Sequence, residues 1–277
     1  MEPISSNRTL RDLSEALAAI ENGATLVVPA NYGGVAMEAT RSLVRRGVKA
    51  LHLITLPTSS LQADLLIGAG CVRLVETSAV SFGELGPAPR FVANVIGGTV
   101  SIKDATCPAL HAALQAAEKG VPFMPLRGII GSDLLAQRPD WKVMDNPFGA
   151  SDPIVLLPAI RPDVALFHAP IADREGNVWV GRRRELFTMA HAAAKSVVTV
   201  EKLFEGNLLE DPLMSGNTIP AFYIEAVAIS PRGAWPLGLA DHYPQDRAHL
   251  IEYLRLAATD AGFQQYLNQH VLPRPAG

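Results

Sequence analysis

Residues 61–135 alternate between helix-patterned runs and short apolar runs that end in glycine, proline or isolated polar residues. The strand candidates are residues 72–75, 100–102 and 121–124, and each follows a helix-patterned run or a glycine turn. Strands that alternate with helices are typical of an α/β protein with a mostly parallel sheet. Ligands of such proteins bind at the loops that follow the strands, so the alternation constrains both the fold and the place of a site.

The same alternation begins near the N-terminus. A predicted strand (24–30), the loop Asn31-Tyr32-Gly33-Gly34 and a predicted helix closed by Gly47 form a β-loop-α unit. Backbone N–H groups at a helix start favour negative charge, and glycine lets a ligand approach the backbone closely. The spacing is not GxGxxG, so it does not indicate a dinucleotide site. On the pattern alone, a structural turn is an equally good interpretation.

Residues 5–19 precede this unit and carry Leu10, Leu13 and Leu17 at helical spacing. The spacing predicts a short amphipathic helix with Ser6 or Thr9 as its N-cap.

The loop at residues 78–89 contains two prolines and two glycines, which favour a rigid shape. It offers Ser78, Ser81 and Glu84 as polar groups beside Phe82 and Gly83. An apolar ring and a lone carboxylate in a rigid loop suit a small acyl group, with Glu84 as a candidate acid or base. The alternative for Glu84 is an exposed acid paired with Arg90.

Further candidates lie at the ends of other predicted elements. Arg127, followed by Gly128, is able to bind a carboxylate or phosphate through two parallel hydrogen bonds, or to brace its own loop or a neighbouring chain. Cys107 begins a predicted helix, where the dipole favours a thiolate, although an ordinary helix-end cysteine is the simpler interpretation. His168 ends a predicted strand, where a structural role is more common than a catalytic one.

Charge and cysteine content exclude several classes of function. The net charge of −3 provides no global field for nucleic acid or an anionic membrane. Arg182-Arg183-Arg184 is the one basic cluster, either a solvated turn or a local site for a phosphate group. Two cysteines give neither a disulfide framework nor a metal-ligand spacing, so we expect no metal and a reducing cytoplasm. We expect no signal peptide and no membrane span. Charged residues make up only 18% of the chain, which indicates an oligomer.

Several of these motifs together resemble the α subunits of the class I coenzyme A transferases, the group that includes glutaconate CoA-transferase. The resemblance rests on DLLIGAG, SFGELGPAPRF, LQAAEKGVPFMPLRGIIGSDL and DVALFHAPIADREGN, and it spans roughly residues 20–256. It implies an α/β fold of the NagB/RpiA/CoA transferase type, a mostly parallel sheet flanked by helices, with a small additional subdomain. We expect one domain over residues 1–277, with a minor subdomain border near residues 141–153, where Asp, Asn, Pro and Gly gather.

The resemblance also implies a function. Such a chain is the α subunit of a heteromeric enzyme that moves coenzyme A between an acyl-CoA and a carboxylic acid. The nucleophilic glutamate belongs to the β subunit, and Glu21-Asn22-Gly23 of this chain is only a turn that imitates its motif. Residues 31–34 would hold the thioester oxyanion, and residues 78–89 would line the other side of a shared pocket. CoA thioester is then a substrate, no cofactor is bound permanently, and the assembly is α2β2 or larger.

Three departures from the family pattern bear on the chemistry. The acid of the Gly-Phe-Glu triplet stands one place later, at Glu84; Cys107 stands where related chains often carry an acid; and Trp235 stands where a histidine is usual. A thioester hydrolase or ring-cleaving enzyme of the same fold is therefore an alternative. A ligand-sensing module and a sugar-phosphate isomerase are outside alternatives, and the former lacks a DNA-binding helix pair or basic patch.

Overall fold

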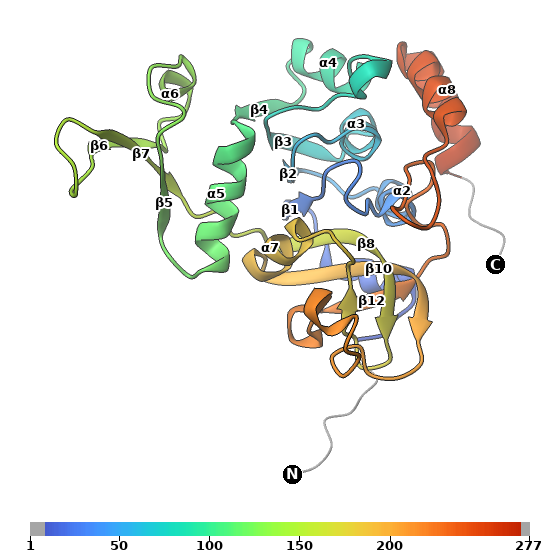
Figure 1. Ribbon diagram of the computed structural model, residues 1–277. Helices are drawn as coiled ribbons and strands as arrows, with labels where there is room; N and C mark the ends of the chain where they lie inside the picture. The colour runs from blue at the N-terminus through green and yellow to red at the C-terminus, as the bar shows by residue number, and fades with distance from the viewer. Residues whose placement is uncertain (1–8, 273–277) are drawn as a thin grey trace.

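The protein is described here by a computed structural model that places residues 9–272. Seven parallel strands form its central sheet (Figure 1), in the spatial order β4-β3-β2-β1-β8-β10-β12. Short antiparallel strands β9 and β11 extend the sheet beside the far end of β8. The strands are β1 (Thr25–Val28), β2 (Leu51–Thr55), β3 (Val72–Thr77), β4 (Ser101–Asp104), β8 (Val164–Asp173), β9 (Val178–Trp179), β10 (Lys195–Phe204), β11 (Thr218–Ile219) and β12 (Ala226–Ile229).

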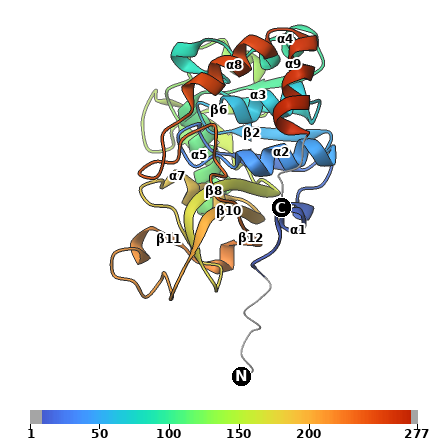
Figure 2. The same cartoon turned by 90° about the vertical axis from the view of Figure 1, so that its right-hand side faces the viewer.

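Helices cover both faces of this sheet. Two separate clusters of buried apolar side chains show the layering, one for each face. The first face packs against α1 (Leu13–Ala16), α2 (Met37–Arg46), α3 (Leu61–Gly68), α4 (Pro89–Ile96), α8 (Arg247–Ala257) and α9 (Asp260–Tyr266), several of which face the viewer in Figure 2. The second face packs against α5 (Cys107–Glu118) and α7 (Glu185–Ala192). The predicted α/β fold with a mostly parallel sheet is therefore confirmed.

A small second sheet projects from this core (Figure 1). It contains β5 (Phe123–Leu126), β6 (Lys142–Asp145) and β7 (Pro153–Pro158), paired antiparallel in the order β5-β7-β6, together with α6 (Leu134–Gln137). The alternation through residue 130 predicted a continuing parallel sheet, and β5 departs from it. Pro125 gives the reason, because proline has no N–H for a central ladder and is confined to edge strands. Residues 141–153, where a border was predicted, contain β6 and lie within this sheet.

The N-terminal helix is shorter than its apolar spacing predicted. It begins at Leu13, after the N-cap Asp12, and continues as a 3-10 turn over Leu17–Ala19. Thr9 does not cap it: its carbonyl accepts from Val227 N at 2.7 Å, and the N–H of Arg11 donates back to the Val227 carbonyl. Residues 9–11 therefore extend along the edge strand β12, and this pairing prevents a longer helix. Ser6 lies outside the described residues.

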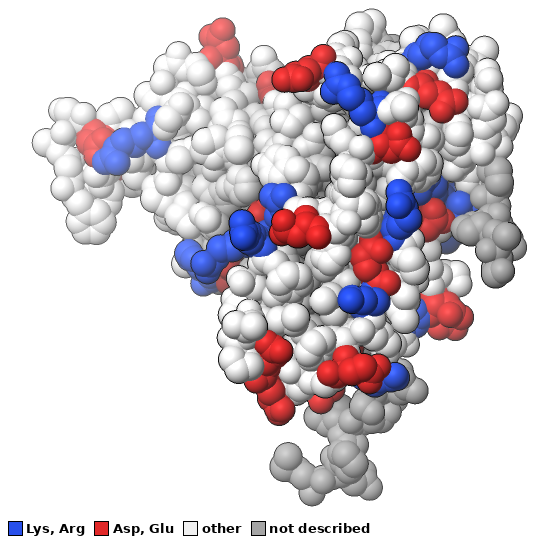
Figure 3. Space-filling view, turned by 45° about the vertical axis from the view of Figure 1, so that its right-hand side comes forward, with Lys and Arg blue, Asp and Glu red and all other residues white. Residues whose placement is uncertain are grey.

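The surface is weakly charged. On the face drawn in Figure 3, acidic and basic side chains are interspersed over a mostly uncharged surface. Within residues 9–272, no helix combines the length and apolar character needed to cross a bilayer.

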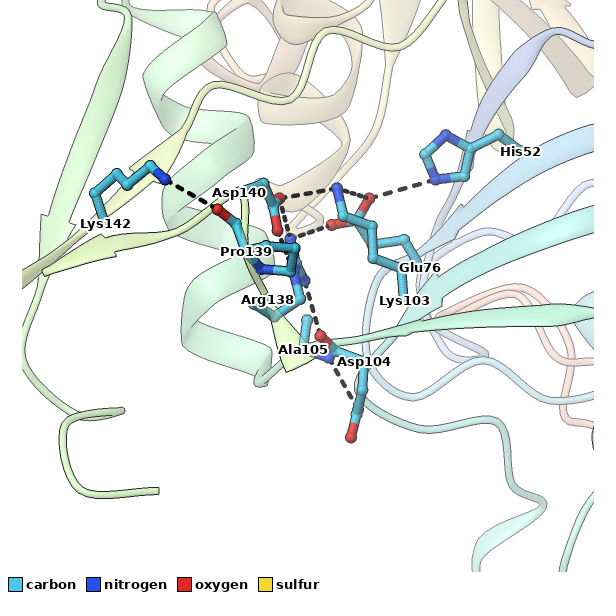
Figure 4. A network of polar contacts seen from close by, with 9 residues as sticks. All are labelled: His52, Glu76, Lys103, Asp104, Ala105, Arg138, Pro139, Asp140 and Lys142. Carbon is cyan, nitrogen blue, oxygen red and sulfur yellow. Dashed lines mark hydrogen bonds and ion pairs between the residues drawn. The ribbon is translucent and has the colours of Figure 1, made fainter. Parts of the chain in front are cut away.

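A buried ionic network fastens the projecting sheet to the core (Figure 4). Arg138, just after α6, donates to Glu76 of β3 and to the Asp104 carbonyl, each at 2.8 Å. Lys103 of β4 joins Glu76 at 3.4 Å and Asp140 at 3.0 Å. Burial favours a higher pKa for Glu76, but the contacts with His52, Lys103 and Arg138 outweigh it and lower the pKa. Glu76 is therefore ionised, and the projecting sheet is anchored through a buried charge.

We expect Arg138→Met to destabilise the protein by about 3 kcal/mol, because it leaves the buried Glu76 carboxylate without its closest cation. Urea unfolding measures the change. Lys142→Met is the matched control, since Lys142 is exposed and, among residues 9–272, reaches only the Pro139 carbonyl, at 3.2 Å. Equal midpoints for the two variants would contradict this role of Arg138.

Candidate active site

The loops that follow β1, β2 and β3 are joined by backbone hydrogen bonds. Asn31 N donates to the Thr58 carbonyl at 3.0 Å, which links the first loop to the second. Ser59 N donates to Ala79 at 3.3 Å, and Ser81 N donates back to Ser59 at 2.9 Å, which links the second loop to the third. Residues 31–34 and 78–89 therefore lie at the same edge of the sheet, with the loop after β2 between them.

The turn at residues 31–34 rests directly on β8. Gly34 adopts φ +85°, and a Cβ built on it would lie 2.2 Å from the His168 carbonyl oxygen. Its own carbonyl accepts from His168 N at 2.7 Å. Only glycine combines this backbone conformation with so close an approach. The close packing of the turn on β8 fixes its position relative to the sheet.

Three consecutive buried residues at this turn have backbone donors without acceptors. Within residues 9–272, the N–H groups of Gly34, Val35 and Ala36 donate no hydrogen bond, although all three residues are buried. Buried backbone donors are almost always paired. These free N–H groups just before α2 are therefore available to an acceptor from outside the chain, such as a carbonyl oxygen that gains negative charge.

A carboxylate that the sequence analysis missed adjoins the same turn. Oε1 of Glu185, at the start of α7, is buried without a hydrogen-bond partner within residues 9–272. It lies 3.1 Å from the position that a Cβ on Gly33 would take. The turn thus has unpaired donors and an unpaired acceptor beside each other. Glu185 directly follows the basic cluster 182–184, but the sequence gives no signal that α7 packs against this turn.

A cavity of about 220 Å³ opens beside Gly33 and Gly34, toward β8 and α7. Its apolar wall includes Trp179, Val180, Leu186 and Leu239. Arg182, Arg183 and His242 also line it, and the guanidinium of Arg183 lies 5.1 Å from the centre of the Tyr32 ring. The sequence predicted a pocket between residues 31–34 and residues 78–89. The cavity described here is a different one, because no residue of 78–89 lines it.

His168 forms a buried hydrogen-bonded chain behind the turn. Its Nδ1 pairs with Thr199 Oγ1 and its Nε2 with Glu201 Oε1, each at 2.8 Å. Tyr243 donates to the same carboxylate at 2.6 Å, and Arg232 N donates to its other oxygen at 2.7 Å. Burial favours a higher pKa for Glu201, but these hydrogen bonds outweigh it and lower the pKa to about 2. The chain holds the side chain of the residue whose backbone lies against Gly34.

The 78–89 loop uses its polar groups internally. Ser81 Oγ accepts from Gly83 N at 3.1 Å and donates to the Gly86 carbonyl at 3.4 Å. Phe82 is 7% exposed, and its ring stacks on Tyr253 of α8 at 5.6 Å, so it belongs to the core and does not line a pocket. Glu84 is exposed and its carboxylate has no partner among residues 9–272. Ser78 is half-buried at the end of β3.

Arg90 does not pair with Glu84, the alternative raised from the sequence. Its guanidinium instead pairs with Asp260 and lies 5.4 Å from the centre of the Phe263 ring.

Arg127 and Gly128 lie apart from the other candidates, on the projecting sheet. Arg127 does form two parallel hydrogen bonds to a carboxylate, but the carboxylate belongs to Asp152 of its own sheet. Cys107 is exposed where β4 leads into α5, at the same edge as the three joined loops. Asn22 accepts from Lys49 N at 2.8 Å, which agrees with a structural turn at residues 21–23.

Gly34→Ala tests the close approach of the turn to β8. We expect a loss of more than about 3 kcal/mol in unfolding free energy, because the new Cβ would overlap the His168 carbonyl. Gly23→Ala is the matched control: its φ is +82° and a Cβ there has nothing within 4 Å, so only the backbone strain of about 1–2 kcal/mol remains. Similar losses in urea unfolding would contradict the role of the contact.

Glu201→Gln tests the buried chain through pH. Because its pKa is lowered, Glu201 contributes stability above its unfolded pKa of about 4.3, and this contribution is lost as the pH falls toward 2. We expect the variant to be less stable at pH 7 and to lose less stability between pH ~4.5 and ~2, as measured by urea midpoints. Glu205→Gln, whose side chain is 84% exposed, is expected to follow the wild type. An unchanged acid dependence in Glu201→Gln would refute the assignment.

Comparison with known proteins places the chain in a family. Residues 10–230 match the family described as "Coenzyme A transferase". An uncharacterized protein of Archaeoglobus fulgidus is 34% identical over 86% of this chain, which spans only 53% of that relative. The A-type subunit of 3-oxoadipate CoA-transferase from Pseudomonas knackmussii is 30% identical over 95% of this chain and 92% of its own length.

Solved structures agree with these sequence matches. A variant of the decarboxylase AibA/AibB superposes with a TM-score of 0.81 and 30% identity, covering 95% of this chain and 100% of its own. Glutaconate coenzyme A-transferase from Acidaminococcus fermentans shares the fold, with a TM-score of 0.90 and 24% identity over 96% of this chain and 90% of its own. The resemblance carried by the loop motifs is thus confirmed, and the chain belongs to the coenzyme A transferase family as a chain of the α-subunit type.

Proposed function

We propose that this chain is the α subunit of a two-subunit CoA-transferase that moves coenzyme A between an acyl-CoA and a carboxylic acid. The nucleophilic glutamate is then supplied by a β-type partner, and the α chain provides the oxyanion site. The observation that carries the proposal is the run of unpaired N–H groups at the buried residues Gly34, Val35 and Ala36, of which Gly34 lines a cavity. Family membership and the similarity to one chain of a 3-oxoadipate CoA-transferase support it.

In this mechanism the partner carboxylate attacks the thioester carbonyl, and negative charge develops on the carbonyl oxygen. Gly34 N–H and Val35 N–H donate to that oxygen. Because the turn is already held by His168, little reorganisation is needed when the charge appears, and such preorganised donors typically contribute about 100- to 1000-fold in rate. The chain Thr199–His168–Glu201 is a positioning device, since it reaches the turn only through the His168 backbone.

The cavity beside the turn suits the acyl part of the substrate. Its apolar wall, formed by Trp179 and Leu186 among others, accommodates a short carbon chain. Arg182 and Arg183 at the same cavity are placed to contact an anionic group, either a CoA phosphate or a carboxylate. Coenzyme A thioester is then a substrate, and no permanently bound cofactor is required.

The projecting sheet supports an assembly of several chains. Apolar side chains are exposed on it, notably Phe123 (43%), Val143 (54%), Met144 (44%) and Phe148 (96%). Large apolar side chains exposed in this way are typical of a subunit interface. We propose an α2β2 or larger assembly in the cytoplasm, in which residues 1–277 act as one domain and Arg127 and Gly128 serve the interface. Glu84 and Ser78, at the shared edge, face the side that the partner would complete.

The test compares the purified chain alone with the chain co-expressed with a β-type chain from the same genome. With an acyl-CoA and an acceptor acid, we expect turnover only from the pair. Borohydride or hydroxylamine is then expected to trap a glutamyl-CoA thioester on the partner. Turnover by the isolated chain would contradict the division of labour.

A second candidate is a lyase or hydrolase of the same fold, favoured by the 30% identity to the decarboxylase AibA/AibB over nearly the whole chain. The pair would then release carbon dioxide or free acid from the acyl-CoA without an acceptor, and no glutamyl-CoA thioester would accumulate. The same assay therefore separates the two candidates.

A further inference from the structure

Three side chains with metal-binding groups meet at the C-terminal helices, away from the turn at residues 31–34. His249 and Glu252 lie three residues apart on one side of α8, and His270 lies on the π-helical segment Leu267–Val271 that follows α9. The hairpin of α8 and α9, visible in Figure 2, brings the segment back to α8. One ligand atom from each side chain lies within 4.8 Å of the others.

The distances within this cluster leave room for an ion. Glu252 lies 4.0 Å from His249 Nδ1 and 3.7 Å from His270 Nε2, both too long for hydrogen bonds. Ligand atoms around a tetrahedral zinc ion, each about 2.0–2.2 Å from it, lie roughly 3.4 Å apart. The ligand atoms are spread over as much as 4.8 Å, so an ion would draw them together by up to about 1.4 Å. Glu252 is 41% exposed on the helix surface, so its side chain is free to move.

One of the nitrogens has no partner in the protein. His270 Nε2 is buried and makes no hydrogen bond within residues 9–272. A buried polar atom without a partner costs about 1–3 kcal/mol, so its position calls for a ligand. It lies 3.7 Å from Glu252 Oε1, a separation that a bridging cation would explain.

His249 is held as metal-binding histidines usually are. The Nε2 atom of His249 is hydrogen-bonded at 2.8 Å to the hydroxyl of Tyr266, which leaves Nδ1 toward the cluster. The Trp235 ring packs against it at 4.5 Å, and the Tyr266 ring packs against His270 at 4.9 Å. Both imidazoles are therefore fixed in orientation before any ion arrives.

One cation lies near this site. The Arg41 guanidinium is 5.2 Å from the centre of the Trp235 ring, which packs against His249. The Arg41 guanidinium is occupied by Glu38 at 3.2 Å and by the Trp235 carbonyl at 2.8 Å, which moderates its repulsion of a cation.

We propose that His249, Glu252 and His270 form a binding site for a divalent transition metal, with zinc as the best chemical match. Two imidazoles and one carboxylate are a typical zinc donor set with a fourth position for water, whereas calcium and magnesium prefer oxygen ligands alone. The ion would fasten the chain end at residues 267–271 to α8. The site is independent of the proposed transferase activity.

The test uses untagged, chelator-treated protein titrated calorimetrically with zinc chloride. We expect one zinc ion per chain. Since loss of a residue that only orients a ligand typically costs about 10–100-fold in affinity, His270→Gln and Glu252→Gln are each expected to cost at least that much, and Tyr266→Phe about tenfold. At zinc concentrations about 100-fold above the wild-type Kd, we expect the Tm of the wild type to rise by roughly 5 °C and that of Glu252→Gln to rise by no more than about half as much.

His191→Gln is the matched control. His191 Nδ1 lies 3.8 Å from Glu118 and its Nε2 is also buried without a partner, but a second histidine is absent from this pair in the described part of the chain. We expect it to bind zinc as the wild type does. Glu252→Gln alters a partly exposed helix residue, so circular dichroism of the metal-free protein will show a retained fold. Absence of stoichiometric binding to the wild type, or equal affinities in all three glutamine variants, would overturn the proposal.

Discussion

The backbone contact between Gly34 and His168 determines the geometry of the candidate active site. It joins the turn after β1 to β8, the next strand of the sheet, through a hydrogen bond of 2.7 Å and a separation that excludes any side chain. His168 is held in turn by Thr199 and Glu201 of β10. Three neighbouring parallel strands thus fix one short turn, and the Gly34 and Val35 donors of that turn remain unpaired within residues 9–272.

The candidate site lies on the helix-covered core, whereas the projecting sheet carries exposed apolar side chains. Both faces of the parallel sheet are covered by helices, and the loops after β1, β2 and β3 are hydrogen-bonded to one another. The projecting sheet, by contrast, meets the core through the Glu76–Arg138 network and exposes apolar side chains. A separation between a preorganised site and an exposed apolar extension agrees with a chain that completes its function within an assembly.

Local signals predicted much of the fold. The β1–turn–α2 unit follows its sequence pattern, and Gly47 closes α2 in the left-handed conformation at φ 70°. Where the prediction was wrong, long-range pairing overrode the local pattern. Residues 9–11 extend along β12, although Leu10 stands at helical spacing from the leucines that follow it. In the second case, β5 joins a separate antiparallel sheet. Pro125 was a readable signal for the second case, whereas nothing in residues 9–11 indicated the first.

The candidate site was only partly readable for a similar reason. The glycine turn could be recognised because a strand, two glycines and a helix are adjacent in sequence. Glu185 and Tyr243 could not, since each reaches the site through the packing of a distant element. His168 was predicted as a strand-end residue, whereas it lies within β8, and its pairing with Glu201 depends on the register between β8 and β10, which places His168 opposite Thr199. Local sequence carries no information on that register.

The close approach of Gly34 to the His168 carbonyl restricts which substitutions the gene can accept at position 34. Every base substitution in a glycine codon that alters the residue adds at least a Cβ or stops translation, and at position 34 a Cβ would fall 2.2 Å from the oxygen of β8. A substitution at position 34 is therefore tolerated only if β8 shifts at the same time. Gly23 has an almost equal φ but open space around it, so a side chain can be added there without a clash.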